Sequence, residues 1–194
     1  MHGTVRPGKP SDSENYHLHN VDLTSEFDCD GLFGQLREKL HQLDTVVLLA
    51  GGFAMGNFDD TNIESISNMH QLNFQTAFNI SQRALNWMKE VNYGNIMLIG
   101  ARPAIEGGGS SMLAYTLSKG LVVQLADLLN EAGRPHNVSA SLIIPGTIDT
   151  ETNRTAMPNA DFTEWVKPST IASHMLHLIS EDGRKSRNPI IKLY

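Results

Sequence analysis

The chain has 194 residues, of which 40% are hydrophobic and 19% charged, with 16 glycines and 8 prolines. This composition is typical of one soluble globular domain, 1–194, long enough to bury roughly 70% of the surface that its unfolded form exposes. The formal net charge of -6 and the scattered basic residues argue against a nucleic-acid surface, because neutralising phosphates requires clustered lysine and arginine.

The cysteine content and the apolar runs narrow the class further. Cys29 is the single cysteine, so the sequence allows neither an intrachain disulfide nor a thiolate metal cage, as expected in a reducing cytoplasm. The longest apolar run, 45–56, is much shorter than the roughly 20 residues of a membrane helix. The close histidine pairs are not completed by carboxylates at metal-site spacing. We expect a cytoplasmic protein without a metal or a membrane partner.

The first half of the chain alternates between strand and helix patterns. Residues 16–23 alternate apolar and polar, which predicts a short strand, and 29–42 have helical spacing. The continuous apolar run 45–50 is typical of a strand covered on both faces. Thr61 and Glu64 have the spacing of a capping box, which predicts a helix from there to about residue 90.

The second half repeats the alternation. A glycine triplet and two serines precede its first helix, and we expect Ser110 and Ser111 to cap that helix. Strands alternating with helices of this length predict an α/β fold, a three-layer Rossmann-like parallel sheet. Ligands in this architecture bind beyond the carboxyl ends of the strands, here just after residues 50, 100 and 144. The expected elements are the strands 94–100, 138–144 and 189–193 and the helices 111–132 and 168–181.

One pair of residues has a spacing with chemical meaning. Tyr115 and Lys119 lie four residues apart in a predicted helix and therefore share a face. A lysine ammonium beside a phenol favours the phenolate and lowers the tyrosine pKa, which prepares it for acid–base work. The alternative is a tyrosine that packs on a lysine stem, which is common in proteins.

Further motifs surround this pair. An Ala50-Gly51-Gly52 turn ends one predicted strand, Asn73 lies in the next helix, and Pro145-Gly146 ends a later strand with Thr150 four residues on. With these residues in place, the chain resembles the short-chain dehydrogenase/reductase family from about residue 16 to 194. The resemblance implies an oxidoreductase that uses NAD or NADP and a small-molecule substrate.

The resemblance also implies roles for particular residues. Tyr115 would be the general acid/base, Lys119 would hold the nicotinamide ribose and lower the tyrosine pKa, and Asn73 would anchor a water for proton relay. The remaining positions would contact the cofactor. Ala50, Gly51 and Gly52 would line the adenine-ribose side, Asp22 would face the adenine, and Pro145, Gly146 and Thr150 would flank the nicotinamide.

One branch of the family is especially similar. Residues 98–104 and 148–165 resemble those of dihydropteridine reductases and related bacterial reductases. Most of the wider family has a serine thirteen residues before the tyrosine, where this chain has Arg102; the dihydropteridine reductases also lack this serine. This resemblance implies hydride transfer, assisted by Tyr115 and Lys119, to a small carbonyl or a quinonoid-pterin-like acceptor.

The glycine-rich turn that normally holds the cofactor's pyrophosphate does not appear before residue 50. Residues 1–6 could be a stub of the family's second strand and the stretch from Tyr16 its third, which would make the sheet N-terminally incomplete and leave two strand edges unpaired. Three explanations remain open: a longer natural protein, a rearranged fold, or a degenerate member. The competing function is therefore a non-catalytic binding or regulatory protein.

The helices that hold Asn73 and Tyr115 have apolar residues on more than one side, which indicates that they are covered twice. Family members pair through these two helices, so the resemblance implies a homodimer or a homotetramer. The apolar residues concerned are Phe74, Phe78, Leu85, Trp87, Leu117, Leu121 and Leu125.

Overall fold

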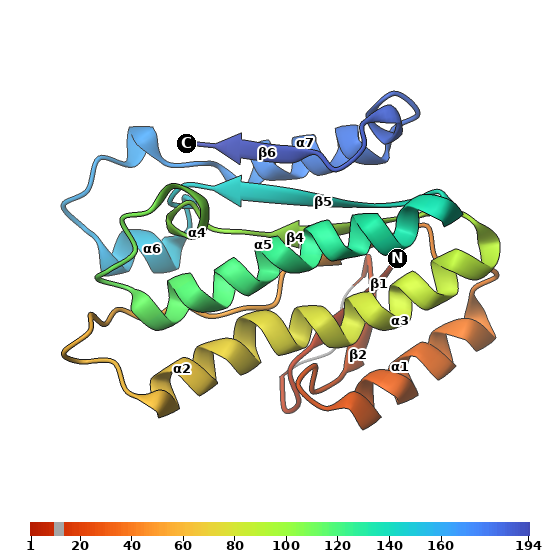
Figure 1. Cartoon of the computed structure of the whole chain (residues 1–194), viewed down its shortest axis with the longest axis horizontal. Helices are drawn as coiled ribbons and strands as arrows, with labels where there is room; N and C mark the ends of the chain where they lie inside the picture. The colour runs from red at the N-terminus through yellow and green to blue at the C-terminus, as the bar shows by residue number, and fades with distance from the viewer. Residues whose placement is uncertain (10–13) are drawn as a thin grey trace.

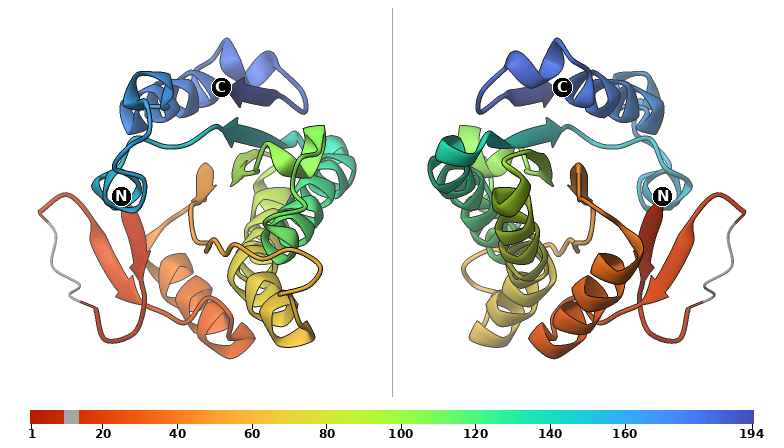
Figure 2. Two further views of the ribbon diagram at one scale, coloured as in Figure 1. Left: turned by 90° about the vertical axis from the view of Figure 1, so that its left-hand side faces the viewer. Right: turned by 90° about the vertical axis from the view of Figure 1, so that its right-hand side faces the viewer.

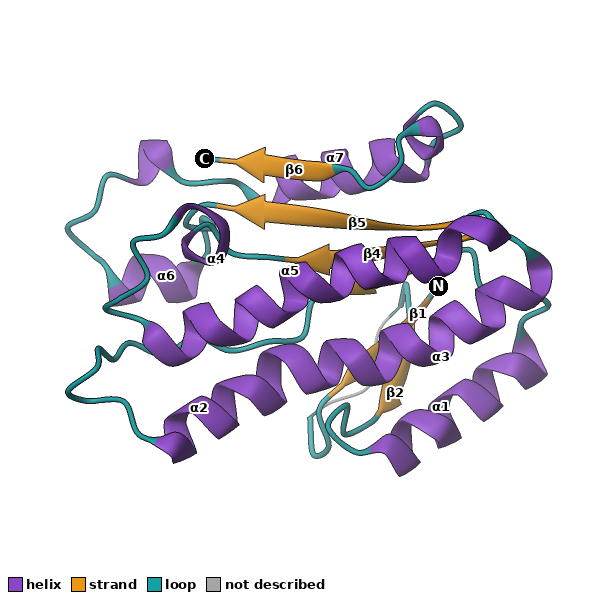
Figure 3. Cartoon of the chain, in the orientation of Figure 1, coloured by secondary structure: helices purple, strands orange, loops and turns teal. Residues whose placement is uncertain are grey.

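The computed structural model of the chain describes residues 1–9 and 14–194. Strands and helices alternate along the described chain (Figure 1), and Figure 3 separates the two kinds of element. The strands are β1 (His2–Val5), β2 (His17–Asn20), β3 (Thr45–Leu48), β4 (Gly94–Ile99), β5 (Val138–Pro145) and β6 (Ile190–Leu193). The α-helices are α1 (Glu26–Lys39), α2 (Ile63–Met69), α3 (Thr76–Val91), α4 (Pro103–Glu106), α5 (Leu113–Gly133), α6 (Glu151–Ala156) and α7 (Pro168–Ile179).

All strand pairings between these elements are parallel, as predicted. One sheet has the order β3-β4-β5-β6, and β1 pairs with β2 in a second sheet. Within the described residues, β1 and β3 each have one edge that pairs with no strand. The predicted strand at residues 1–6 and the strand after Tyr16 are thus both present and adjacent.

Helices cover the four-stranded sheet on both faces, which confirms the three-layer α/β class. Helices α1, α3 and α5 lie side by side on one face, and α7 lies on the other (Figures 1 and 2). Alternation along β4 explains the two cores, because successive side chains of a strand point to opposite faces. Ile96 and Leu98 join the core under α3 and α5, whereas Met97 packs in the core that contains Leu178 of α7.

Two predicted helix starts are wrong by a small margin. Asn62, not Thr61, caps α2, and its Oδ1 accepts a hydrogen bond from the backbone N of Ser65 at 2.8 Å. Ser110 and Ser111 do not cap α5, whose N-cap is Met112 without a side-chain bond. The loop before α2 replaces that cap, because the carbonyl of Gly56 accepts from the N–H of Leu113 at 2.8 Å.

The apolar residues predicted to form an interface divide into two groups. Leu85, Trp87 and Leu125 are buried in the core, so the structure corrects their assignment. Leu117 and Leu121 are 50% and 42% exposed and remain available on α5. Among the described helices, none has both the length and the hydrophobicity needed to cross a membrane.

Candidate active site

Helix α5 brings Tyr115 and Lys119 to the carboxyl end of β4. Tyr115 is half-buried, and Lys119 is only 7% exposed. The Lys119 ammonium donates a hydrogen bond to the carbonyl of Ile99, the last residue of β4, with Nζ and O 2.9 Å apart. An ammonium has three N–H donors, so this bond leaves two donors for a ligand at the same edge of the sheet.

Burial shifts the pKa values of both groups away from their ordinary ranges. It lowers the pKa of Lys119 to about 8 and raises the pKa of Tyr115, because a low-dielectric surrounding disfavours each charged form. The expected lowering of the tyrosine pKa by Lys119 is therefore wrong for this structure. The desolvation of the phenol dominates, and the lysine ammonium bonds to the Ile99 carbonyl.

Asn73 is buried at 1% exposure inside a π-helical segment, His70–Gln75, between α2 and α3. Such π segments inside α-helices often occur at functional sites. The side-chain amide of Asn73 bonds the backbone of Gly52 in both directions, with both distances 3.0 Å. Nδ2 also donates to the hydroxyl of Ser118 at 3.0 Å. Asn73 thus links the turn after β3 to α5, and its expected role as a water anchor stays a prediction.

The turn Ala50-Gly51-Gly52 passes close to the side chains of Asn73 and Lys119. A Cβ atom on Gly51 would lie 2.6 Å from Oδ1 of Asn73 and 3.7 Å from Nζ of Lys119. A side chain there would displace the Asn73 amide, so only glycine allows this approach. Gly51, Asn73 and Lys119 therefore meet as predicted, and Ala50 lies exposed at the start of the same turn.

Two residues of this site were not singled out from the sequence. Ser118 donates its hydroxyl to the carbonyl of Tyr115 at 2.7 Å while accepting from Asn73, so it joins the two candidate residues. Phe53 lies edge-on to the ring of Tyr115, with ring centroids 5.0 Å apart, and is itself 59% exposed. The i, i+3 spacing of Tyr115 and Ser118 on one helix was a usable signal, whereas the position of Phe53 depends on loop geometry.

The remaining predicted contacts lie at the same edge of the sheet. Pro145 ends β5 beside the end of β4, and the N–H of Gly146 donates to the carbonyl of Leu193 at 2.7 Å. Thr150 is the N-cap of α6, where its hydroxyl accepts from the N–H of Asn153 at 3.2 Å. Thr150 thus has a structural role, and its contact with a cofactor stays a prediction.

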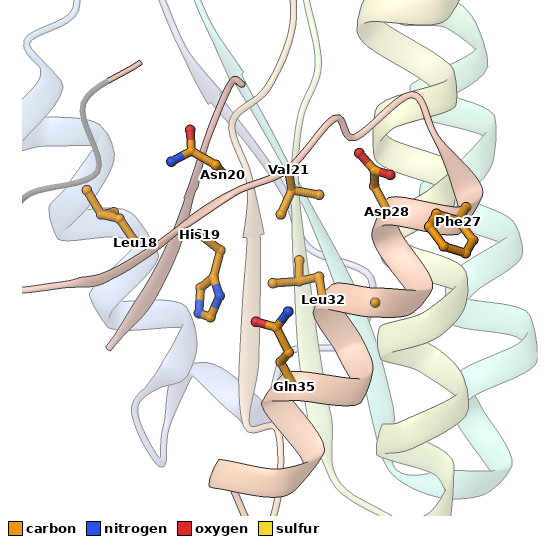
Figure 4. Close-up of a pocket in the computed structure, with 9 residues that line it drawn as sticks. Leu18, His19, Asn20, Val21, Phe27, Asp28, Leu32 and Gln35 are labelled. Carbon is orange, nitrogen blue, oxygen red and sulfur yellow. The ribbon is translucent and has the colours of Figure 1, made fainter. Parts of the chain in front are cut away.

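Asp22 follows β2 and shapes the turn into α1. Its Oδ1 accepts from the N–H and the hydroxyl of Thr24, at 2.9 and 2.7 Å, and these bonds lower the pKa of the carboxyl. A cavity of about 530 Å³, lined by residues of β2 and α1, lies next to this turn (Figure 4), and Tyr115 is not among its lining residues. Asn20 and Val21 line the cavity, whereas Asp22 does not.

The described residues fit one half of a dinucleotide better than the other. Two free N–H donors of the buried Lys119 and the close approach at Gly51 suit a ribose at the carboxyl edge of the sheet. In residues 1–9 and 14–49, no glycine-rich turn leads into a helix that could hold a pyrophosphate. Within the described chain, no group of three or more His, Cys, Asp or Glu side chains is arranged to hold a metal ion.

Sequence comparison identifies the class to which this fold and site belong. The short chain dehydrogenase family profile matches residues 8–161, so the chain belongs to this family of NAD(P)-dependent oxidoreductases. It is 28% identical over 180 residues to a dihydropteridine reductase of Dictyostelium discoideum, which covers 91% of this chain and 77% of that protein.

Two further matches are more distant. A 3-ketodihydrosphingosine reductase of Mus musculus is 27% identical over 68% of this chain, which spans only 40% of that protein. The solved structure of ElxO with NADP bound superposes with a TM-score of 0.84 at 20% sequence identity. That match covers 93% of this chain and 77% of ElxO, and it shows the shared fold alone.

Proposed function

We propose that the chain is an NAD(P)H-dependent reductase in which Tyr115 delivers the proton and Lys119 holds the nicotinamide ribose. The observation that carries the proposal is the meeting of Lys119, Asn73 and Gly51 at the end of β4, one helical turn from Tyr115. The NADP-bound state of ElxO supports this cofactor class. When bound, the reduced cofactor supplies the hydride.

The chain's own residues account for the proton. Because burial raises its pKa, Tyr115 stays protonated at neutral pH and can donate its phenolic proton to the acceptor. The step leaves a phenolate on Tyr115, and water returns the proton. Asn73 and Ser118 hold the turn after β3 in a fixed position relative to α5 during this step. A protonated Tyr115 can donate a proton but cannot accept one, so these roles favour reduction of the acceptor over the reverse oxidation.

The acceptor that we propose is a small carbonyl or a quinonoid-pterin-like compound. The similarity to the dihydropteridine reductase of Dictyostelium discoideum supports the pterin-like choice. The exposed ring of Phe53 beside Tyr115 offers an apolar surface on which a flat acceptor could rest.

A second candidate function is a non-catalytic binding or regulatory protein. The observation that favours it is the division of the described strands into two sheets, which leaves one edge of β1 and one edge of β3 unpaired. Such a protein would keep the fold and part of the pocket but would lack the turn that binds the cofactor's pyrophosphate. Turnover distinguishes the two candidates, because only the reductase consumes NADPH in the presence of an acceptor.

The pH dependence of the rate tests the reductase proposal. In this proposal Lys119 holds the ribose as an ammonium, and its pKa is lowered to about 8. The proton is therefore present below about pH 8 and lost as the pH rises through that value. We expect NADPH-dependent reduction of a quinonoid dihydropterin to decline above pH 8 when followed by absorbance from pH 6 to 10.

A Lys119→Met variant is the matched comparison. It should lose most of the rate, and its remaining activity should no longer decline between pH 8 and 10. A wild-type rate that is constant up to pH 10 would remove Lys119 from the mechanism. Absence of turnover with every acceptor, at cofactor concentrations that saturate binding, would favour the binding-protein alternative.

We also propose that the chain forms a homodimer through α5. Leu117, Leu121 and Leu128 are exposed on this helix, at 50%, 42% and 53%. Light scattering should give twice the 21.4 kDa of one chain, and Leu121→Lys should give the monomer. Leu176→Lys, which changes a 65% exposed leucine on α7, should stay dimeric. A monomeric wild type at micromolar concentration would contradict the proposal.

A further inference from the structure

One carboxylate at the carboxyl edge of the sheet collects three donors. Oε1 of Glu106, at the end of α4, accepts from Nζ of Lys192 at 2.8 Å, and the hydroxyl of Tyr194 donates to the same oxygen. Oε2 accepts from Nε of Arg102 at 3.1 Å. The Arg102 guanidinium also lies over the Tyr194 ring, 4.6 Å from its centroid. Glu106 therefore joins α4 to the end of β6.

The contacts between α4 and the end of β6 extend to residues of the candidate active site. Leu193, between the two β6-side donors, accepts the N–H of Gly146 at 2.7 Å. A Cβ on Gly146 would lie 3.1 Å from Cβ of Tyr194, so the two segments are in close contact. On the other side, α4 follows Ile99, whose carbonyl holds Lys119. Glu106 thus links α4, which follows the end of β4, to the end of β6. The end of β6 in turn bonds Gly146, just after β5.

The same contacts give a role to Arg102, which stands where most of the family has a serine. Arg102 pairs with Glu106 and stacks on Tyr194, and its side chain is 58% exposed. A guanidinium stays protonated at every relevant pH and has no acceptor, so it cannot replace a serine hydroxyl in proton exchange. Its contacts are those of a structural clamp on β6.

We propose that Glu106 is a positioning residue whose carboxylate fixes Gly146, and with it the nicotinamide side of the site, by holding the end of β6 against α4. The proposal rests on the proposed reductase function only for its kinetic consequence. Its three donors lower the pKa of Glu106 to about 2, so the carboxylate is ionised throughout the working pH range. Exposed ion pairs contribute little to global stability, so the effect should be local.

The test compares Glu106→Gln with Glu131→Gln, which removes an exposed carboxylate from α5 at a distance from this junction. Amide hydrogen exchange should be about tenfold faster at Gly146 and at residues 190–194 in Glu106→Gln. In this variant, local opening of the segment no longer has to break the contacts of the Glu106 carboxylate. Glu131→Gln should exchange like the wild type. Tyr194→Phe, which removes one donor, should show a smaller change in the same segments.

The kinetic readout separates positioning from general destabilisation. We expect Glu106→Gln to raise the KM for NADPH about tenfold and to change kcat by less than about threefold, as for lost binding of the cofactor. Unchanged exchange at Gly146 would overturn the proposal, and so would an equal change in Glu131→Gln or a fall in kcat with constant KM. If the wild type shows no turnover, the reductase function fails, and the exchange data alone decide the role of Glu106.

Discussion

Replacing Tyr115 by phenylalanine should lower the rate of NADPH-dependent reduction at least about 100-fold, the usual contribution of a general acid. The phenylalanine ring keeps the packing against Phe53, so the fold should be retained. Only the hydroxyl is lost, and with it the proton that the acceptor needs. Steady-state kcat/KM and the circular dichroism of the variant measure the two parts of this prediction.

Tyr93→Phe is the matched control. Tyr93 packs under the guanidinium of Arg184, 4.3 Å from its ring centroid, at the start of β4 and therefore at the opposite end of the strand from Lys119. This variant should retain the wild-type rate. Near-normal turnover by Tyr115→Phe would remove Tyr115 from the mechanism, whatever the other residues do.

We expect the 194-residue chain to bind NADPH about 10² to 10⁴ times more weakly than an enzyme with a complete pyrophosphate site. Charge-assisted hydrogen bonds contribute about 1.5–3 kcal/mol each, and two of them correspond to this range at about 1.4 kcal/mol per tenfold. The turn between β2 and α1 contains no glycine, and Ser25 uses its hydroxyl to cap the helix. Titration of NADPH fluorescence measures the Kd.

A chain extended before His2 by one strand, a glycine-rich turn and a helix is the comparison for this titration. The added strand would have the unpaired edges of β1 and β3 available, and its turn would supply N–H donors for the pyrophosphate. The extended chain should bind at least 100-fold more tightly, by the estimate above. Micromolar binding by the 194-residue chain would show that another element holds the phosphates.

Much of the fold follows from local patterns. The apolar run at 45–50 and the apolar–polar alternation at 16–23 predict strands, and parallel pairing follows from the helices between the strands. The closeness of Gly51, after β3, to Ile99, which Lys119 bonds at the end of β4, follows in turn, because the carboxyl ends of neighbouring parallel strands share one edge. The family resemblance adds the roles, which the positions alone do not contain.

The features that the sequence does not reveal depend on tertiary packing. The pKa of Tyr115 rises because the phenol is desolvated, and the spacing of Tyr115 and Lys119 does not report burial. Trp87 and Leu125 lie in the core because α3 and α5 pack on the sheet in one particular rotation, which an apolar pattern on two sides cannot specify. The contacts of Glu106 with Lys192 and Tyr194 join residues 86 and 88 positions apart, beyond any local signal.

The central claim, that Tyr115 and Lys119 form a working reductase site, is tested most directly by hydride transfer at high cofactor concentration. Millimolar NADPH deuterated at the transferred position should compensate for weak binding, and mass spectrometry then detects oxidised cofactor that has lost the deuterium, together with the reduced acceptor. We predict both products with the wild type and at least about 100-fold less of each with Tyr115→Phe. Saturable NADPH binding without oxidised cofactor or reduced acceptor, for any quinonoid pterin or small carbonyl, would contradict the account.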